Sequence, residues 1–216
     1  ADSVCLQSTG TGTSNTIFGK NAGDSIASGG NYNSIFGEDA GTAIGVGDNN
    51  VVMGYQAGST FTSGSNNTLV GYQAGTSLQS SYYKNTLIGA EAGGGANMAV
   101  NFTTAVGFGA LKALTASTAN TAIGYEALVS NSTGSNNCTA VGYWAGRYAT
   151  TTPDSTFVGT SAGYSVTTSS YATHIGTSSG YGVAESGKWL TGNLNTTVGY
   201  KAGFKMVGTA SHNTIV

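Results

Sequence analysis

The residue types that most often do chemistry in proteins are few in this chain, and they stand far apart. The 216 residues include two cysteines, Cys5 and Cys138, and two histidines, His174 and His212. Neither histidine has a cysteine or a carboxylate at the spacing of a metal-ligand set. We therefore expect no metal site at these four residues.

The acidic residues and serines also lack the spacing of a catalytic site. Glu38 and Asp39 are adjacent, so they point to opposite faces of a strand or lie in a turn, and they do not form a catalytic pair. No serine stands in a Gly-x-Ser-x-Gly elbow followed by an Asp and a His. The glycines at 93–95 are not followed by the Lys-Ser/Thr of a phosphate-binding loop. We therefore expect a protein that is not an enzyme and has no cofactor.

The composition excludes some classes of binding partner. Charged residues make up 7% of the chain and the formal net charge is −2, so no positive field is available to hold nucleic acid. No apolar run approaches the roughly 18–20 residues that a membrane span needs, and we expect no membrane insertion. Glycine is about one residue in six, at 35 of 216.

The elements that could position a site come from an internal repeat, Asn-Thr-x-(Val/Ile)-Gly. Nine of the ten intervals between its closing glycines are 17 or 18 residues, and the last is 23. The clearest copies open with asparagine, at Asn15, Asn33, Asn67, Asn85, Asn120 and Asn195. The closing glycines are Gly19, Gly37, Gly54, Gly71, Gly89, Gly107, Gly124, Gly142, Gly159, Gly176 and Gly199. Below, these glycines are called the anchor glycines.

The repeat predicts a fold. Apolar clusters of four or five residues, rich in Thr, Val and Ile and cut by glycine, are typical of strands rather than helices. Short coils of constant length gain their core by stacking on their neighbours. We therefore expect an all-β parallel β-solenoid or β-roll of 11–12 coils, forming a single repeat domain over residues 1–216 with incomplete repeats at both ends.

Strand alternation gives each coil an inner and an outer face. The large apolar residue before each anchor glycine shares a face with the threonine two residues earlier, and we predict that this face is the interior. The residue between them, such as Ile17 or Leu69, then points outward and is too apolar for simple solvent. This favours a homotrimer packed around an axis, although a return segment of the same chain could cover that face. The predicted inward direction of the threonines also argues against an ice-binding solenoid, which needs flat rows of threonine on its outer surface.

The repeat positions have structural explanations. Stacked asparagine side chains can hydrogen-bond along a row, and the tyrosines after the anchor glycines can form either a structural stack or a binding face. The two cysteines are eight coils apart, roughly 38 Å at about 4.8 Å per coil, too far for a disulfide within one chain. Cys5 is then a small core residue and Cys138 fills an asparagine position, with a bridge between chains as the alternative.

Binding residues are expected where the repeat is broken. The long interval places an insertion within residues 181–195, and insertions in solenoids often carry function. Trp189 can stack on a sugar, or alternatively cover apolar surface. The candidate receptor-binding or glycan-binding residues are Trp189, Lys188, Tyr181, Trp144 (next to Arg147 and Tyr148), Tyr82 and Tyr83.

The segment Asn-Thr-Ala-Ile-Gly-Tyr-x-Ala at 120–127 resembles repeats of bacteriophage tail fibres and of related fibre-like bacterial adhesins. More loosely, it is similar to the head repeats of trimeric autotransporter adhesins, whose coils are shorter. The resemblance implies a trimeric fibre, extracellular at a cell surface or on a virion tail, that mediates adhesion by binding a cell-surface glycan or receptor. The alternative is a subunit of a self-assembling extracellular filament that polymerises head to tail.

Overall fold

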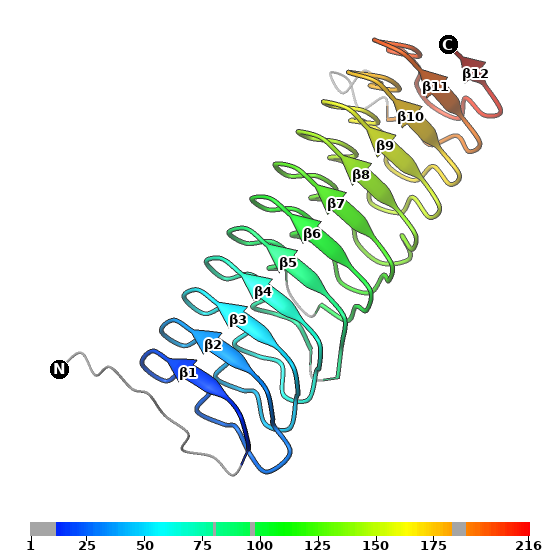
Figure 1. Ribbon diagram of the computed structural model, residues 1–216. Coiled ribbons are helices and arrows are strands. Elements are labelled where there is room, and N and C mark those ends of the chain that lie inside the picture. The colour runs from blue at the N-terminus through cyan, green and yellow to red at the C-terminus, as the bar shows by residue number, and fades with distance from the viewer. Residues whose placement is uncertain (1–11, 80, 96–97, 183–188) are drawn as a thin grey trace.

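The computed structural model describes residues 12–79, 81–95, 98–182 and 189–216, and these form a parallel β-solenoid without helices. Twelve strands make one sheet in which each strand lies beside the next one in sequence, so the coils stack into a rod (Figure 1). The strands are β1 (Thr16–Phe18), β2 (Ser34–Phe36), β3 (Val51–Met53), β4 (Thr68–Val70), β5 (Thr86–Ile88), β6 (Thr104–Val106), β7 (Thr121–Ile123), β8 (Thr139–Val141), β9 (Thr156–Val158), β10 (Thr173–Ile175), β11 (Thr196–Val198) and β12 (Thr214–Ile215). The predicted fold class is confirmed.

Each of the first eleven strands occupies the three residues before an anchor glycine, and equivalent residues pair without a shift. Thr68 lies beside Thr86, for example, and Val70 beside Ile88. The glycine is required where the chain leaves the strand. At Gly54 φ is +132°, and a Cβ there would lie 2.7 Å from the carbonyl carbon of Gly71 in the next coil. A side chain at this position would therefore push the coils apart.

The predicted assignment of inner and outer faces was wrong. In β1–β11 the middle residue of the strand is buried, whereas the first residue, threonine in all but β2 and β3, and the residue before the glycine face outward. Alternation holds, but its phase is set by the residue before the strand, which is buried asparagine in most coils. The apolar middle residues that suggested a trimer axis lie inside the coil, and Thr16 and its equivalents lie outside.

The interior is narrow, which explains why large side chains occupy the outer positions. Where the middle residue is small, as at Ala105 and Ala122, a buried leucine fills the space from the turn, Leu111 or Leu128 respectively. Where the middle residue is the large Phe157, the corresponding turn positions in the same coil and in the previous coil are occupied by glycine instead of leucine. A Cβ at the previous coil's Gly146 would meet the Phe157 ring at 2.8 Å. Large side chains on the strand are thus matched by small residues in the turn, and small ones by large, which avoids both voids and overpacking.

A second buried row lies on the opposite side of the coil, seven residues after most anchor glycines. Val183, which stands seven residues after Gly176, lies outside the described residues. The pairings Leu78 with Met98 and Val166 with Leu190 show which residues take these places. The pairing of Leu190 restores the stack after the long interval, so the extra residues lie between Tyr181 and Leu190.

The predicted asparagine ladder is confirmed. The side-chain oxygen of Asn50 accepts a hydrogen bond from the backbone N–H of Asn67 at 2.9 Å and one from its side-chain amide at 3.2 Å. The amide of Asn67 also donates to the carbonyl of Tyr82 at 3.0 Å. Asn85 repeats the pattern on Asn67. Cys138 stands in this row, where its N–H donates to Asn120. Cys5 lies outside the described residues.

Replacing Asn67 with alanine tests the ladder. The change leaves the buried N–H of Asn85 and the carbonyl of Tyr82 without their partners. Unpaired buried groups cost about 1–3 kcal/mol each, so the two groups predict a loss of about 2–6 kcal/mol in the free energy of unfolding. Denaturant unfolding of Asn67→Ala measures it. Thr62→Ala, at an exposed position in the preceding coil, serves as the control. Equal stability of the two variants would contradict a structural role for the ladder.

The buried middle position of β10 is occupied by His174. Among the middle residues of β1–β11, His174 has the one side chain that titrates. Its ring stacks on Phe157 with centroids 5.8 Å apart, and its Nδ1 is 2.7 Å from the hydroxyl oxygen of Thr197. Its Nε2 is buried and has no hydrogen-bond partner among the described residues. Burial lowers the pKa of His174 to about 4, from 6.5.

This pKa predicts a pH-dependent stability. Between pH 6.5 and pH 4 the unfolded chain binds a proton at His174 and the folded chain does not. The contribution is complete above pH 6.5 and is lost as the pH falls toward 4, by up to about 3 kcal/mol. Subtracting the unfolding free energies of His174→Leu from those of the unaltered chain isolates this term from the carboxylates. A difference that stays constant across this range would refute the assignment.

Candidate binding surfaces

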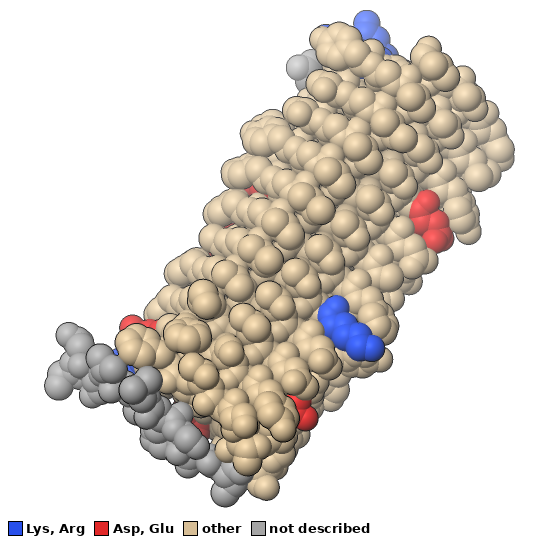
Figure 2. All heavy atoms as spheres, in the orientation of Figure 1, with Lys and Arg blue, Asp and Glu red and all other residues tan. Residues whose placement is uncertain are grey.

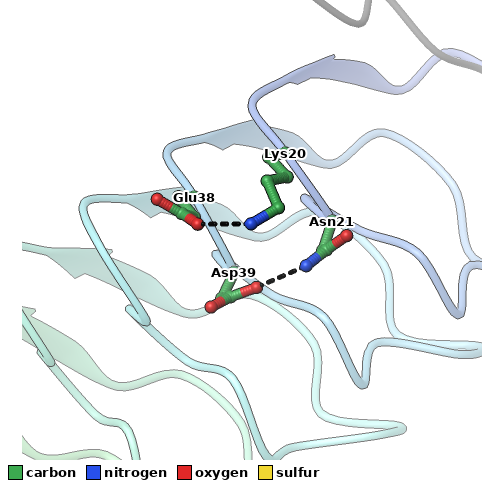
Figure 3. A network of polar contacts seen from close by, with 4 residues as sticks. All are labelled: Lys20, Asn21, Glu38 and Asp39. Carbon is green, nitrogen blue, oxygen red and sulfur yellow. Dashed lines mark hydrogen bonds and ion pairs between the residues drawn. The ribbon is translucent and has the colours of Figure 1, made fainter. Parts of the chain in front are cut away.

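The charged residues near the N-terminal end pair with one another across neighbouring coils. Lys20 forms an ion pair with Glu38 at 3.0 Å, and Asn21 donates a hydrogen bond to Asp39 at 2.8 Å (Figure 3). The ion pair is exposed, so it contributes little to stability. Glu38 and Asp39 thus each face the previous coil, and neither points toward the other as a catalytic pair does. In the described part of the chain no group of three or more His, Cys, Asp or Glu could hold a metal ion.

Cys138 is also unsuited to surface chemistry. The thiol is buried, and burial raises its pKa above the ordinary value. It contacts the carbonyl oxygen of Thr152, an interaction that places it as a donor within the core. Because the thiolate is the reactive form, this cysteine is a packing residue.

The aromatic side chains after the anchor glycines do stack. Tyr55 and Tyr72 lie with centroids 5.8 Å apart, and Phe108, Tyr125 and Tyr143 follow at 5.4 and 5.2 Å, with interplanar angles of 14–15°. All five are exposed. The row is broken between Tyr72 and Phe108 by an alanine and between Tyr143 and Tyr200 by two threonines. It therefore contains two short stacks rather than one continuous surface.

A larger aromatic cluster adjoins this row over the C-terminal coils, since the ring centroids of Tyr143 and Trp144 lie 4.3 Å apart. We call it the aromatic ridge, and it consists of Trp144, Tyr148, Tyr164, Tyr181, Trp189 and Phe204. Tyr164, Tyr181 and Phe204 stack in succession, with centroids 4.8 and 5.0 Å apart. Trp144 lies 5.8 Å from Tyr164, and Tyr148 contacts both Tyr164 and Trp189 at 5.1 Å. All six side chains are half-buried, so each keeps some surface in contact with solvent.

An ion pair fixes one end of the aromatic ridge. Arg147 contacts Glu126 at 2.8 Å, and its guanidinium carbon lies 4.4 Å from the centre of the Trp144 ring. The indole N–H of Trp144 donates to Glu126 at 3.0 Å. Both charged side chains are about one-fifth exposed, which strengthens their attraction relative to a solvated pair. The ridge therefore combines preorganised rings with a polar group beside them.

Hydrogen bonding to Tyr164, together with partial burial, raises the pKa of Tyr148 above 10. Its phenol is therefore protonated at neutral pH and can donate a hydrogen bond. Partial desolvation and the neighbouring Glu126 also raise the pKa of the exposed Tyr125. The cluster thus presents neutral hydroxyls rather than additional negative charge.

The structure gathers three of the six candidates named from the sequence. Trp144, Tyr181 and Trp189 belong to the aromatic ridge, through Tyr164 and Tyr148. Lys188 lies outside the described residues. Tyr82 and Tyr83 lie elsewhere, in the coil before β5. Tyr82 packs partly against the core, and Tyr83 contacts Phe102 edge-on at 5.5 Å.

The candidates predicted from the sequence did not include Tyr164, Phe204 or Glu126. A signal for two of them was present, because Tyr164, Tyr181 and Phe204 each stand five residues after an anchor glycine and so must lie in one row. Glu126 and Trp144 also share a row, since each stands two residues after an anchor glycine, but the contact of Glu126 with Arg147 joins two different rows.

A second candidate surface is the outer side of the strands. From β4 to β11 the two outward positions of each strand carry no charged residue, and in Figure 2 the broad face over these strands is free of Lys, Arg, Asp and Glu. Below, this surface is called the strand face.

Among the described residues no helix is long and apolar enough to cross a bilayer. Comparisons with protein-family models, with curated proteins and with solved structures find no match to this chain.

Proposed function

We propose that this chain is an adhesive segment of an extracellular fibre and that it attaches to a cell surface by binding glycan at the aromatic ridge. The observation that carries the proposal is the ridge itself, six half-exposed aromatic rings held beside a Glu126–Arg147 ion pair. Sugars offer apolar C–H faces that pack on aromatic rings and hydroxyls that bond to polar side chains. Aromatic walls with a few fixed polar groups are the usual chemistry of such sites.

The shape of the ridge favours an elongated ligand. Tyr164, Tyr181 and Phe204 come from three successive coils, so a glycan chain lying along the rod can contact a new ring at each step of about 4.8 Å. The rings are immobilised before binding by their mutual stacking, which lowers the entropy lost when the ligand binds. Several weak contacts on one rigid support add up to useful affinity.

The rest of the chain supports a fibre role. Coils that stack in register form a stiff rod in which each repeat contacts only its neighbours. Such a rod holds a binding surface away from its point of attachment. The resemblance to tail-fibre and adhesin repeats implies the same role and a homotrimer. The apolar residues that first suggested a trimer axis are inside the coil, so within this proposal trimeric assembly rests on the resemblance.

Removing one ring tests the proposal. We expect Trp144→Ala to weaken binding of the purified chain to its best ligand on a glycan array about fivefold, because one aromatic contact is worth about 1 kcal/mol. Tyr171→Ala is the matched control. Tyr171 is exposed outside the ridge, and its φ of 56° equals that of Trp144, 57°, within a degree. The two alanine variants therefore carry the same backbone strain.

Calorimetric titration with the ligand found on the array gives the affinities. Unchanged affinity in Trp144→Ala, or an equal loss in Tyr171→Ala, would show that the ridge is not the binding site. Tyr164→Ala, which removes the central ring, should lower the affinity at least as much as Trp144→Ala.

A further inference from the structure

The strand face is uniform in a way that the rest of the surface is not. In β4–β11 every outward residue is β-branched, with threonine at the first position and valine or isoleucine at the third. The threonines are Thr68, Thr86, Thr104, Thr121, Thr139, Thr156, Thr173 and Thr196. The aliphatic residues are Val70, Ile88, Val106, Ile123, Val141, Val158, Ile175 and Val198. The first three strands depart from this pattern, with Phe18, Phe36 and Met53 at the third position.

These sixteen side chains form two straight ladders. The strands are parallel and pair without a shift, so Thr104 lies beside Thr121 and Val106 beside Ile123. The same pairing continues through β11. Figure 1 shows the strands lying side by side along the rod. At about 4.8 Å per coil the two ladders run for roughly 34 Å. The face is therefore a periodic array with one hydroxyl and one aliphatic group per step.

The threonine hydroxyls are not engaged by the protein. The side chains of these eight threonines make no hydrogen bond to any part of the chain that the structure describes. Elsewhere on the rod, exposed threonines do bond across coils, as Thr115 does with Thr133 at 2.9 Å. The strand face thus offers a row of free hydroxyls, each held half-buried between its neighbours.

The ladders are also stiff. Threonine, valine and isoleucine have restricted χ1 angles, and the backbone beneath them is fixed in a sheet. Little side-chain entropy remains to be lost when a ligand covers the face. The large flexible side chains that normally anchor a protein partner, such as Trp, Tyr and Arg, are absent from these sixteen positions.

From these observations we propose that the strand face over β4–β11 binds the surface of ice. A water crystal is a ligand that repeats in space, and its oxygen atoms recur at nearly the spacing of adjacent strands. Threonine hydroxyls can take the places of lattice waters at each step, while the methyl groups beside them fill the hollows between. The absence of charge on the face matters, because charged groups hold hydration shells that do not fit a crystal lattice. Each step contributes little, and the array binds through repetition.

A second protein chain fits this face less well. Covering it with protein removes eight hydroxyls from water, and each one left unpaired costs about 1–3 kcal/mol. Against ice every hydroxyl keeps a water partner. The argument from the sequence against ice binding depended on the threonines pointing inward, and that orientation is the one the structure reverses. The proposal is independent of glycan binding, since the aromatic ridge uses no strand residue.

The test compares the unaltered chain with substitutions at the centre of the face. We expect the purified chain to shape growing ice crystals, to produce thermal hysteresis and, when fluorescently labelled, to coat particular planes of a single ice crystal. Thr121→Lys places a flexible charge in the middle of the array and should abolish most of the hysteresis. Thr121→Val keeps the shape and loses one hydroxyl, so it should retain part of the hysteresis. Thr62→Lys adds the same charge at an exposed position outside the strand face and should leave the hysteresis unchanged.

Circular dichroism confirms that each variant is folded, and sedimentation gives the number of associated chains. A folded, unaltered chain that does not affect ice growth would overturn the proposal. So would an equal loss of hysteresis in Thr62→Lys. If Thr121→Lys instead dissociates an oligomer and leaves ice growth as it was, the strand face is an interface between copies of this chain and the proposal is wrong.

Discussion

The structure depends on in-register stacking of each coil on the next, and the buried asparagine before the strand is the residue that fixes it. The Asn67 side chain bonds to the coil on one side through Asn50 and to the coil on the other through Asn85. A shift of one residue between coils would leave these groups unpaired inside the core, where the cost is high. The ladder also determines which strand residues face outward, because its inward direction sets the phase of alternation. The strand face follows from that phase, whereas the aromatic ridge follows from the register in which the turns stack.

The recurrence of glycine every 17 or 18 residues was enough to predict the fold, because close contact between coils at a positive φ admits no other residue. The inner and outer faces could not be predicted in the same way. Both alternating positions are apolar in most coils, and hydropathy favours Ile123 over Ala122 as the buried residue, which is the wrong choice. The decision lies in the volume available inside, and Leu128, which fills the space left by Ala122, stands six residues further along the chain. That exchange of volume between distant positions is visible only in three dimensions.

The candidate site could be predicted only in part, because some of its contacts join residues from different rows of the stack. Trp189 was a candidate because it lies within the break in the period, and Trp144 was a candidate together with its neighbours Arg147 and Tyr148. Tyr148 connects them, since the stacking of coils brings it against Trp189 across the long interval. Residues that share a row, such as Tyr164 and Phe204, can be found from the period alone. Contacts between different rows, such as Glu126 with Arg147, cannot, because they depend on the path of the turns.

The rod thus carries the two proposed binding surfaces, half-exposed aromatic rings in the turns and a stiff hydroxyl array on the strands. The strand face depends on the outward direction of the threonines, which thiol labelling measures most directly. In folded Thr121→Cys the new thiol should react with a soluble maleimide nearly as fast as a free cysteine, whereas in Ala122→Cys it should be protected until the chain unfolds. Mass spectrometry of the peptide containing the position gives both rates. Protection at 121 with rapid reaction at 122 would reverse the two faces and contradict the account.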